Sequence, residues 1–136
     1  GLVAQLPARR LRLAIAAVLD IALNGGPAPV PAKALAARQN LPPRHLEPVL
    51  QALVRNGILK GTRGPRGGYR VAASEDRITC ADILHAIAGM EDEDSDDGLS
   101  PLVAATVDPA LGEAGEAYVA ALEAVSLSDL RARAGG

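Results

Sequence analysis

Basic side chains with spacing suited to binding phosphate recur in residues 41–71 of this 136-residue chain. Lys60, Arg63, Arg66 and Arg70 lie within eleven residues that contain no acidic residue. Clustered cations bind phosphate oxygens, and an arginine on a narrow turn suits the minor groove of DNA, where the negative potential is strongest. A generic basic turn is the alternative interpretation. We expect a nucleic-acid contact.

An amphipathic helix at residues 43–56 is expected to position this basic segment. Its apolar residues recur at helical spacing and are Leu46, Val49, Leu50, Leu53, Val54 and, just beyond, Ile58. Pro42 and Pro43 suit a helix start, because their missing N–H groups would have no intrahelical partner there. Asn56-Gly57 is a stop signal that accommodates a left-handed cap.

Two further patterns complete a winged helix-turn-helix. The segment at 58–71 predicts two short strands around Gly64-Pro65-Arg66-Gly67-Gly68, with a wing at 60–70. A shorter helix is expected at 31–38, and residues 39–41 make a tight turn into the helix at 43–56.

The remaining elements are helical. Arg9 to Asn24 predicts a first helix, and Thr79 is a plausible N-cap for a helix ending at Ala88. The fold class is mainly α with a small β-hairpin. We divide the chain into a DNA-binding domain at 9–89, an acidic flexible loop at 90–108, and a dimerisation helix with a short terminal helix, capped by Ser126, at 109–134.

The charge distribution separates these parts. Residues 1–80 carry twelve Arg and Lys against four acidic residues, a net charge of +8, whereas residues 81–136 carry two against twelve, a net charge of −10. This asymmetry suggests a basic module that meets a polyanion and an acidic module that does not. The cations at the start of the first helix are either a solvated helix end or phosphate contacts, because the helix dipole disfavours them there.

Composition argues against several other classes of protein. No apolar run is long enough to span a membrane, and one cysteine excludes an internal disulfide, so we expect a cytoplasmic protein. We expect Cys80 and His85 to be packing residues of the core rather than metal ligands. The acidic run at 91–97 does not fit an EF-hand loop, and no nucleophile–base pair indicates an enzyme, so neither a metal site nor a cofactor is expected.

The long helix from Pro109 to Val125 needs something to cover its apolar stripe. The expected dimerisation residues are Leu111, Tyr118, Leu122 and Val125. A two-fold partner helix in a homodimer is the favoured interpretation. An intramolecular cover for the first helix is the alternative.

The stretch LPPRHLEPVLQALVRNGILKGTRGPRGGYRVA, with VPAKALAARQN before it and ITCADILHAIAG after it, resembles the Rrf2 family of bacterial transcription regulators. This family includes the iron–sulfur cluster regulator and the nitrite-sensing repressor. The likeness runs from about residue 9 to residue 130, and its specific feature is the LExxLxxLxxxGIL helix followed by the RGPRGGY wing. It implies a winged-helix homodimer that binds operator DNA, with the helix at 43–56 in the major groove and the wing in the minor groove.

Carried over by position, Arg44, His45 and Glu47 would face the major groove, and Arg63, helped by Arg66, would enter the minor groove. Glu47 would accept a hydrogen bond from cytosine N4, and Arg44 would read guanine or hold phosphate. The expected DNA-binding residues are Arg9, Arg10, Arg12, Lys33, Arg44, His45, Glu47, Arg63, Arg66, Gly67 and Tyr69.

Pro48 departs from the family pattern, because family members often carry a polar side chain that reads a base at this position. Its missing N–H would leave the Arg44 carbonyl without a helical hydrogen bond and bend the helix.

A second departure concerns the cofactor. Cluster-bearing members resemble one another in carrying three cysteines in the loop before the long helix, whereas here that loop, MEDEDSDDGLSP, has none. Acidic side chains do not replace three thiolates, so the resemblance implies a clusterless member. A small molecule, a partner protein, a metal at the acidic loop, or Cys80 oxidation remain as possible signals.

The favoured hypothesis is therefore a dimeric, sequence-specific repressor. The alternative is a protein–protein adaptor that has lost specific DNA binding, which Pro48 and the acidic tail would suit.

Overall fold

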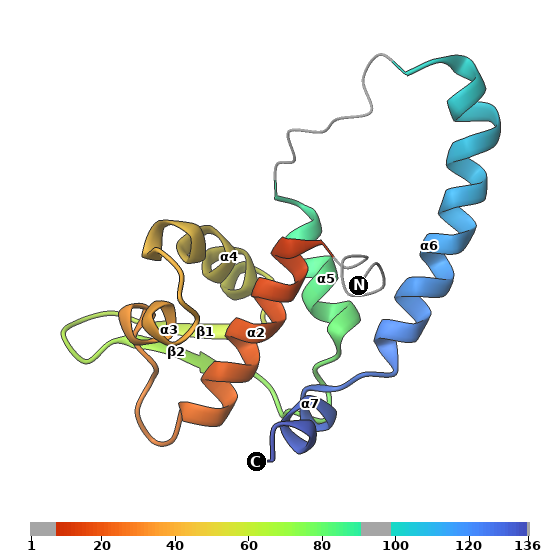
Figure 1. Cartoon of the computed structure of the whole chain (residues 1–136). Coiled ribbons are helices and arrows are strands. Elements are labelled where there is room, and N and C mark those ends of the chain that lie inside the picture. The colour runs from red at the N-terminus through yellow and green to blue at the C-terminus, as the bar shows by residue number, and fades with distance from the viewer. Residues whose placement is uncertain (1–7, 91–98, 136) are drawn as a thin grey trace.

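The computed structural model describes residues 8–90 and 99–135, which form a mainly helical structure with one antiparallel hairpin, as the sequence predicted. Figure 1 shows their arrangement. The elements are α2 (Arg9–Asn24), α3 (Ala32–Arg38), α4 (Pro43–Arg55), β1 (Leu59–Thr62), β2 (Gly68–Val71), α5 (Cys80–Ala88), the π-helical turn η1 (Val103–Val107), α6 (Asp108–Glu123) and α7 (Leu127–Arg133).

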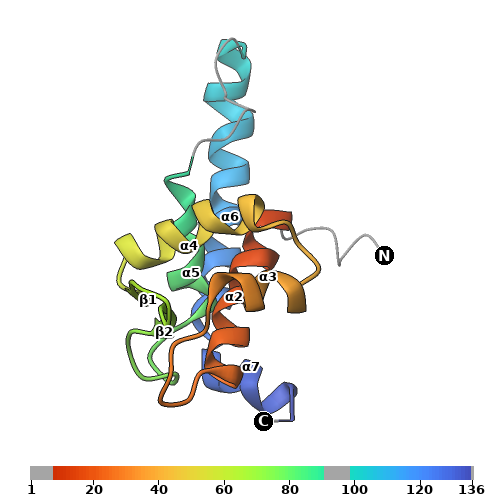
Figure 2. The same ribbon diagram turned by 90° about the vertical axis from the view of Figure 1, so that its left-hand side faces the viewer.

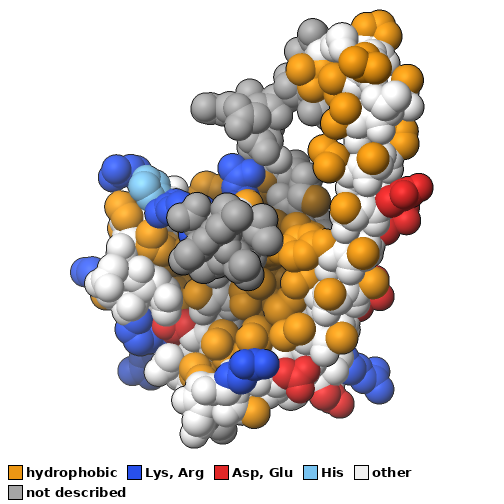
Figure 3. Space-filling model, turned by 45° about the vertical axis from the view of Figure 1, so that its right-hand side comes forward, with side chains coloured by type: hydrophobic (Ala, Val, Ile, Leu, Met, Phe, Trp, Pro, Cys, Tyr) orange, Lys and Arg blue, Asp and Glu red, His pale blue; other side chains and the backbone are white. Residues whose placement is uncertain are grey.

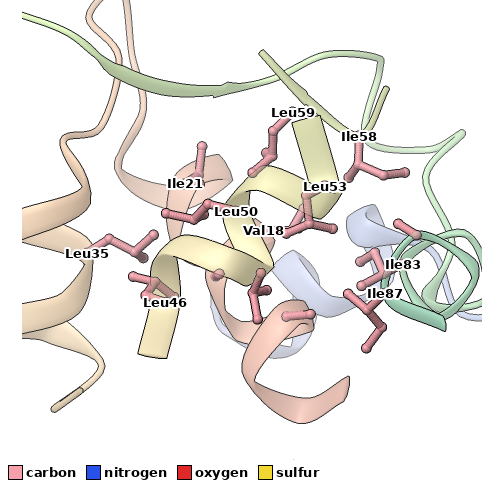
Figure 4. Close-up of a cluster of buried hydrophobic side chains, with 14 of the residues drawn as sticks. Val18, Ile21, Leu35, Leu46, Leu50, Leu53, Ile58, Leu59, Ile83 and Ile87 are labelled. Atoms are coloured by element: carbon pink, nitrogen blue, oxygen red, sulfur yellow. The ribbon is translucent and has the colours of Figure 1, made fainter. Parts of the chain in front are cut away.

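The hydrophobic core forms where α2, α4 and α5 meet (Figure 4). Three leucines of α4, Leu46, Leu50 and Leu53, are fully buried. They pack with large buried side chains from the surrounding elements, namely Val18, Ile21, Leu35, Leu59, Ile83 and Leu127. Burying a leucine contributes about 1.5–3 kcal/mol, so this aliphatic contact can hold α4 without any aromatic side chain.

The ends of α4 lie where the sequence placed them. Pro43 occupies the first turn, and Gly57 adopts the left-handed conformation with φ of 77° directly after the helix. The Asn56 side chain donates to the carbonyl of Ala52 at 2.8 Å and to that of Ala86 at 3.2 Å, which ties the end of α4 to α5. The helix runs on through Pro48 without interruption.

The hairpin pairs Leu59 with Val71 and Thr62 with Gly68. The segment before α3 extends it, because the Val30 N–H donates to the Tyr69 carbonyl at 2.9 Å and the Tyr69 N–H donates to the Val30 carbonyl at 2.8 Å. The chain entering α3 therefore anchors the base of the wing.

A buried carboxylate fixes α3 against α2. Asp20 is only 5% exposed and accepts hydrogen bonds from Arg38 at 2.7–3.1 Å and from Gln39 at 2.8 Å. Asn24 adds a longer bond at 3.3 Å. Burial by itself raises the pKa of Asp20, but these hydrogen bonds and the Arg38 charge outweigh it and lower the pKa below its ordinary value.

The C-terminal segment returns to the core through α7. Leu127 is buried, its N–H donates to the Ile78 carbonyl at 2.8 Å, and Arg131 pairs with Glu75 at 2.7 Å. Both predicted caps are confirmed, since Thr79 and Ser126 each begin a helix with a capping box.

The long helix differs from expectation at both ends. Residues 101–107 are already helical, so the loop expected at 90–108 is shorter, and the acidic residues 91–97 lie outside the described residues. At the other end α6 stops at Glu123, and Val125 lies in the connection to α7, where its carbonyl accepts from the Cys80 N–H at 2.9 Å. Pro109 lies in the first turn of α6, directly after the π-helical turn η1.

No residue of α6 is fully buried. Its C-terminal half packs along α5, and its N-terminal half projects away from the other described helices (Figures 1 and 3). Leu122 contacts the core, whereas Leu102, Val107 and Leu111 are 67%, 43% and 65% exposed. None of the described helices is long and apolar enough to cross a membrane.

Replacing Asp20 by Asn should lower the free energy of unfolding by about 1–3 kcal/mol at pH 7, because the Arg38 and Gln39 donors lose their charged acceptor. The folded-state pKa of Asp20 is depressed, so this stability is present above the unfolded-state value of about 4 and is lost as the pH falls through the folded-state value. Urea unfolding at pH 7 and below pH 4 measures both effects. Asp76→Asn, at an exposed position, is the control; unchanged stability of Asp20→Asn at pH 7 would contradict the role of the network.

Replacing Gly67 by Ala should deform the wing. The new Cβ would lie 2.2 Å from the Thr62 carbonyl oxygen, a contact that the backbone must move to relieve, at a cost of about 1–3 kcal/mol. Gly26→Ala is the matched control, because a Cβ there meets nothing within 4 Å. Thermal unfolding compares the two, and equal melting temperatures would show that the hairpin is looser than described.

Candidate nucleic-acid interface

The recognition face is the side of α4 opposite its buried leucines. Arg44, Glu47, Pro48, Gln51 and Arg55 are all exposed and recur at spacings of three and four. Figure 2 shows this helix, α3 and the hairpin together on one face of the molecule. The buried stripe of α4 therefore determines which polar side chains point outward.

All four cations of the wing, Lys60, Arg63, Arg66 and Arg70, are exposed, and Arg70 makes a hydrogen bond within the chain. Arg63 and Arg66 are exposed in the turn between β1 and β2. Arg70 is also exposed, but its guanidinium donates to the Pro27 carbonyl. The sequence did not indicate this contact, because the two residues are 43 positions apart. Lys60 lies within β1, so Arg63 and Arg66 are the exposed cations in the turn at the tip of the wing.

Two predicted binding residues shape the wing. Gly67 leaves no room for a Cβ beside Thr62, and Tyr69 exchanges backbone hydrogen bonds with Val30 while its side chain packs on the core. Lys33 is exposed in α3, and this helix lies on the side of the molecule that carries α4 and the hairpin (Figure 2).

The start of α2 meets the start of α4. Arg9 and Arg10 line a hollow of about 470 Å³ together with Arg44, His45 and Pro48. Arg12 is exposed but does not line it. Three arginines from segments 34 residues apart thus gather around one depression, which is an arrangement suited to an anion. Sequence reasoning singled out each residue but did not place them together.

Gln51 and Arg55 were not among the predicted binding residues. Gln51 lies four positions after Glu47, and Arg55 four positions after Gln51, so both follow from the helical repeat once the buried face is known. Gln51 also lines a groove shared with the wing. The repeat was the signal that could have found them.

The thiol of the cysteine in this chain is buried and therefore poorly accessible to a metal ion. Cys80 is 4% exposed at the start of α5, and burial, followed by the nearby charge of Asp129, raises the pKa of its thiol. Within residues 8–90 and 99–135, no three His, Cys, Asp or Glu side chains group in a way that could hold a metal ion.

Comparisons with known proteins agree with this architecture. Residues 8–133 match the family described as "Rrf2: Iron-dependent Transcriptional regulator". The protein rrf2 of Nitratidesulfovibrio vulgaris is 31% identical over 125 residues, which cover 89% of this chain and 83% of that protein. The HTH-type transcriptional regulator IscR of Escherichia coli O1:K1 is 34% identical over 76 residues, which cover 56% of this chain and 47% of that regulator, so the match spans about half of its length.

A solved structure extends the likeness to the fold. The structure of IscR from T. potens superposes with a TM-score of 0.74 at 25% identity, covering 98% of this chain and 91% of that one. The match thus includes the winged helix-turn-helix and the long helix. The chain belongs to the Rrf2 family of transcriptional regulators.

Proposed function

We propose that this regulator is a homodimeric repressor that binds a specific operator, with α4 in the major groove and the wing in the minor groove. The observation that carries the proposal is that α4 and the hairpin lie together on one side of the molecule (Figure 2), while the outward residues of α4 and the wing residues Arg63 and Arg66 are all exposed. A B-DNA major groove about 12 Å wide admits a helix, and an arginine-tipped wing suits the adjacent narrow groove. The net charge of +8 in residues 1–80 supports a polyanionic partner.

Base reading would fall to the first turns of α4. Glu47 is exposed and accepts from cytosine N4, while Arg44 offers a bidentate donor to guanine or holds phosphate. The hollow that Arg44 shares with Arg9 and Arg10 supports phosphate contact at the same end of α4. Pro48 presents no side-chain donor, yet α4 is continuous through it, which weakens the main argument for an adaptor without DNA binding.

Dimerisation is supported by the exposure of the C-terminal helical segment. Leu102, Leu111 and Tyr118 are 67%, 65% and 38% exposed, and Figure 3 shows hydrophobic side chains along this segment and on the body beside it. Exposed apolar patches of this kind mark interaction surfaces. A two-fold dimer would present two copies of α4 to two half-sites of a palindromic operator. A dimer seated on DNA excludes other proteins from that site, which is why we propose repression.

We infer that the regulator acts without an iron–sulfur cluster, although its family is described as iron-dependent. Such clusters are held mainly by several thiolates, and this chain has one cysteine, buried Cys80, whose raised pKa disfavours the thiolate. The residues therefore do not fit the cofactor. A small molecule or a partner protein would then supply the signal, and no enzymatic step is proposed.

Replacing Arg63 and Arg66 together by Ala should weaken operator binding. It should also make the negative slope of log K, where K is the association constant, against log salt concentration shallower by about 2, because two phosphate or minor-groove contacts are lost. Arg77→Ala, at an exposed position outside the wing and α4, is the control. Mobility-shift titrations at several salt concentrations, on duplexes selected from random sequence, measure both quantities. If the unmodified chain shows no sequence preference at moderate salt, it is not a specific regulator.

Replacing Leu111 by Glu should convert a dimer into monomers, because a carboxylate would enter an apolar contact between two chains. Ala120→Glu adds the same side chain nine residues further along, on the opposite side of α6, and should leave the dimer intact. Sedimentation analysis gives the molecular mass of each. A monomeric unmodified chain would refute the dimer.

A further inference from the structure

A groove of about 420 Å³ separates α4 from the wing. It is lined by Gln51 and Val54 of α4, by Thr62 and Arg63 of the hairpin, and by Pro31 and Ala32 where α3 begins. We propose that this groove seats one phosphate of the DNA backbone, held by the Gln51 side-chain amide and the Arg63 guanidinium. The inference rests on the proposed function, and it assigns a ligand to a surface between the two reading elements.

The geometry of a duplex supports this assignment. The major and minor grooves are adjacent and are divided by a single sugar–phosphate strand. A protein with α4 in one groove and the wing in the next must straddle that strand. The surface that lies between α4 and the hairpin is this groove, so the backbone passes across it.

The lining suits a phosphate. Gln51 and Arg63 are exposed and offer N–H donors, and Thr62 offers a hydroxyl. No acidic side chain is among the residues that line the groove in the described part of the chain. Val54 and the Tyr69 ring add apolar surface against which a deoxyribose can rest.

Gly61 keeps the groove open. A Cβ at this position would make only ordinary contact with the Tyr69 ring, at 3.7 Å, so the fold itself does not require glycine there. Gly61 is exposed in β1 and faces the groove. The absence of its side chain leaves space that a strand of DNA can occupy.

Base reading is the competing role for Gln51, because glutamine pairs with adenine through two hydrogen bonds. Its position favours phosphate. Gln51 lines the groove together with the wing, whereas Arg44 lines the separate hollow beside α2, at the start of α4. Of these two α4 residues, Gln51 is the one on the wing side.

The test uses the full chain and the duplex that it selects from random sequence. Gln51→Ala should weaken binding about tenfold, which corresponds to about 1.4 kcal/mol, because a hydrogen bond to a charged phosphate is lost. Gln51→Glu should weaken it further by placing a carboxylate beside the phosphate. A set of duplexes, each with one uncharged methylphosphonate linkage, should contain one per half-site on which Gln51→Ala causes no additional loss.

Two results would overturn the assignment of Gln51 to a phosphate, and a third would refute the proposed function. If the loss in Gln51→Ala persists on every methylphosphonate duplex but disappears when one base pair is changed, Gln51 reads a base. If Gln51→Ala binds as tightly as the unmodified chain, Gln51 makes no contact. If the unmodified chain selects no duplex, the proposed function itself is refuted. This outcome differs from the other two because the variants then have no wild-type affinity with which to be compared.

A second variant tests the space rather than the donor. Gly61→Val should weaken binding to the selected duplex at least fivefold while retaining the melting temperature, because an extended strand accepts a β-branched residue. Gly26→Val, in the open connection between α2 and α3, is the control and should keep full affinity. Unchanged affinity of a folded Gly61→Val variant would show that no strand occupies the groove.

Discussion

Burial of one face of α4 is the constraint on which the rest of the structure depends. Leu46, Leu50 and Leu53 are enclosed by α2, α3 and α5 (Figure 4). Truncating one such leucine typically costs 2–5 kcal/mol, a large part of the roughly 5–15 kcal/mol that keeps a domain folded. Rotation of α4 about its axis would expose these leucines, so the polar face carrying Arg44, Glu47 and Gln51 is held outward.

A few polar contacts then set the positions of the neighbouring elements. The carboxylate of Asp20 orients α3, the amide of Asn56 joins α4 to α5, and Arg131 joins α7 to Glu75 and to the Ala22 carbonyl. Apolar contacts are not directional, whereas hydrogen bonds are, so these groups supply the orientation that an aliphatic core lacks. The wing is oriented in the same way, through the paired backbone of Val30 and Tyr69.

The C-terminal helix follows a different rule. Helix α6 has small and apolar residues on much of its surface, yet buries none of them completely. Its contact with α5 accounts for only part of its length, and the apolar side chains beyond that contact face solvent in the single chain. Such exposure is unfavourable by about 25 cal/mol per Å² of apolar surface, so a partner that covers it gains free energy. The reading face and the apolar helix are thus separate surfaces, one for a polyanion and one for protein.

Features that depend on neighbouring residues could be predicted from the amino-acid sequence. The bounds of α4, the hairpin around its glycines and the caps at Thr79 and Ser126 follow from local backbone preferences and short-range hydrogen bonds, and the family followed from the same stretch. Contacts between residues far apart in the chain could not be predicted in this way, because they depend on how the elements pack. Packing between segments produces three such contacts. Arg70 donates a hydrogen bond to the Pro27 carbonyl, Arg9 and Arg10 lie beside Arg44, and Gln51 lines a groove together with the wing. Periodicity specifies which face of a helix is buried, but the element that covers that face is chosen by the whole core.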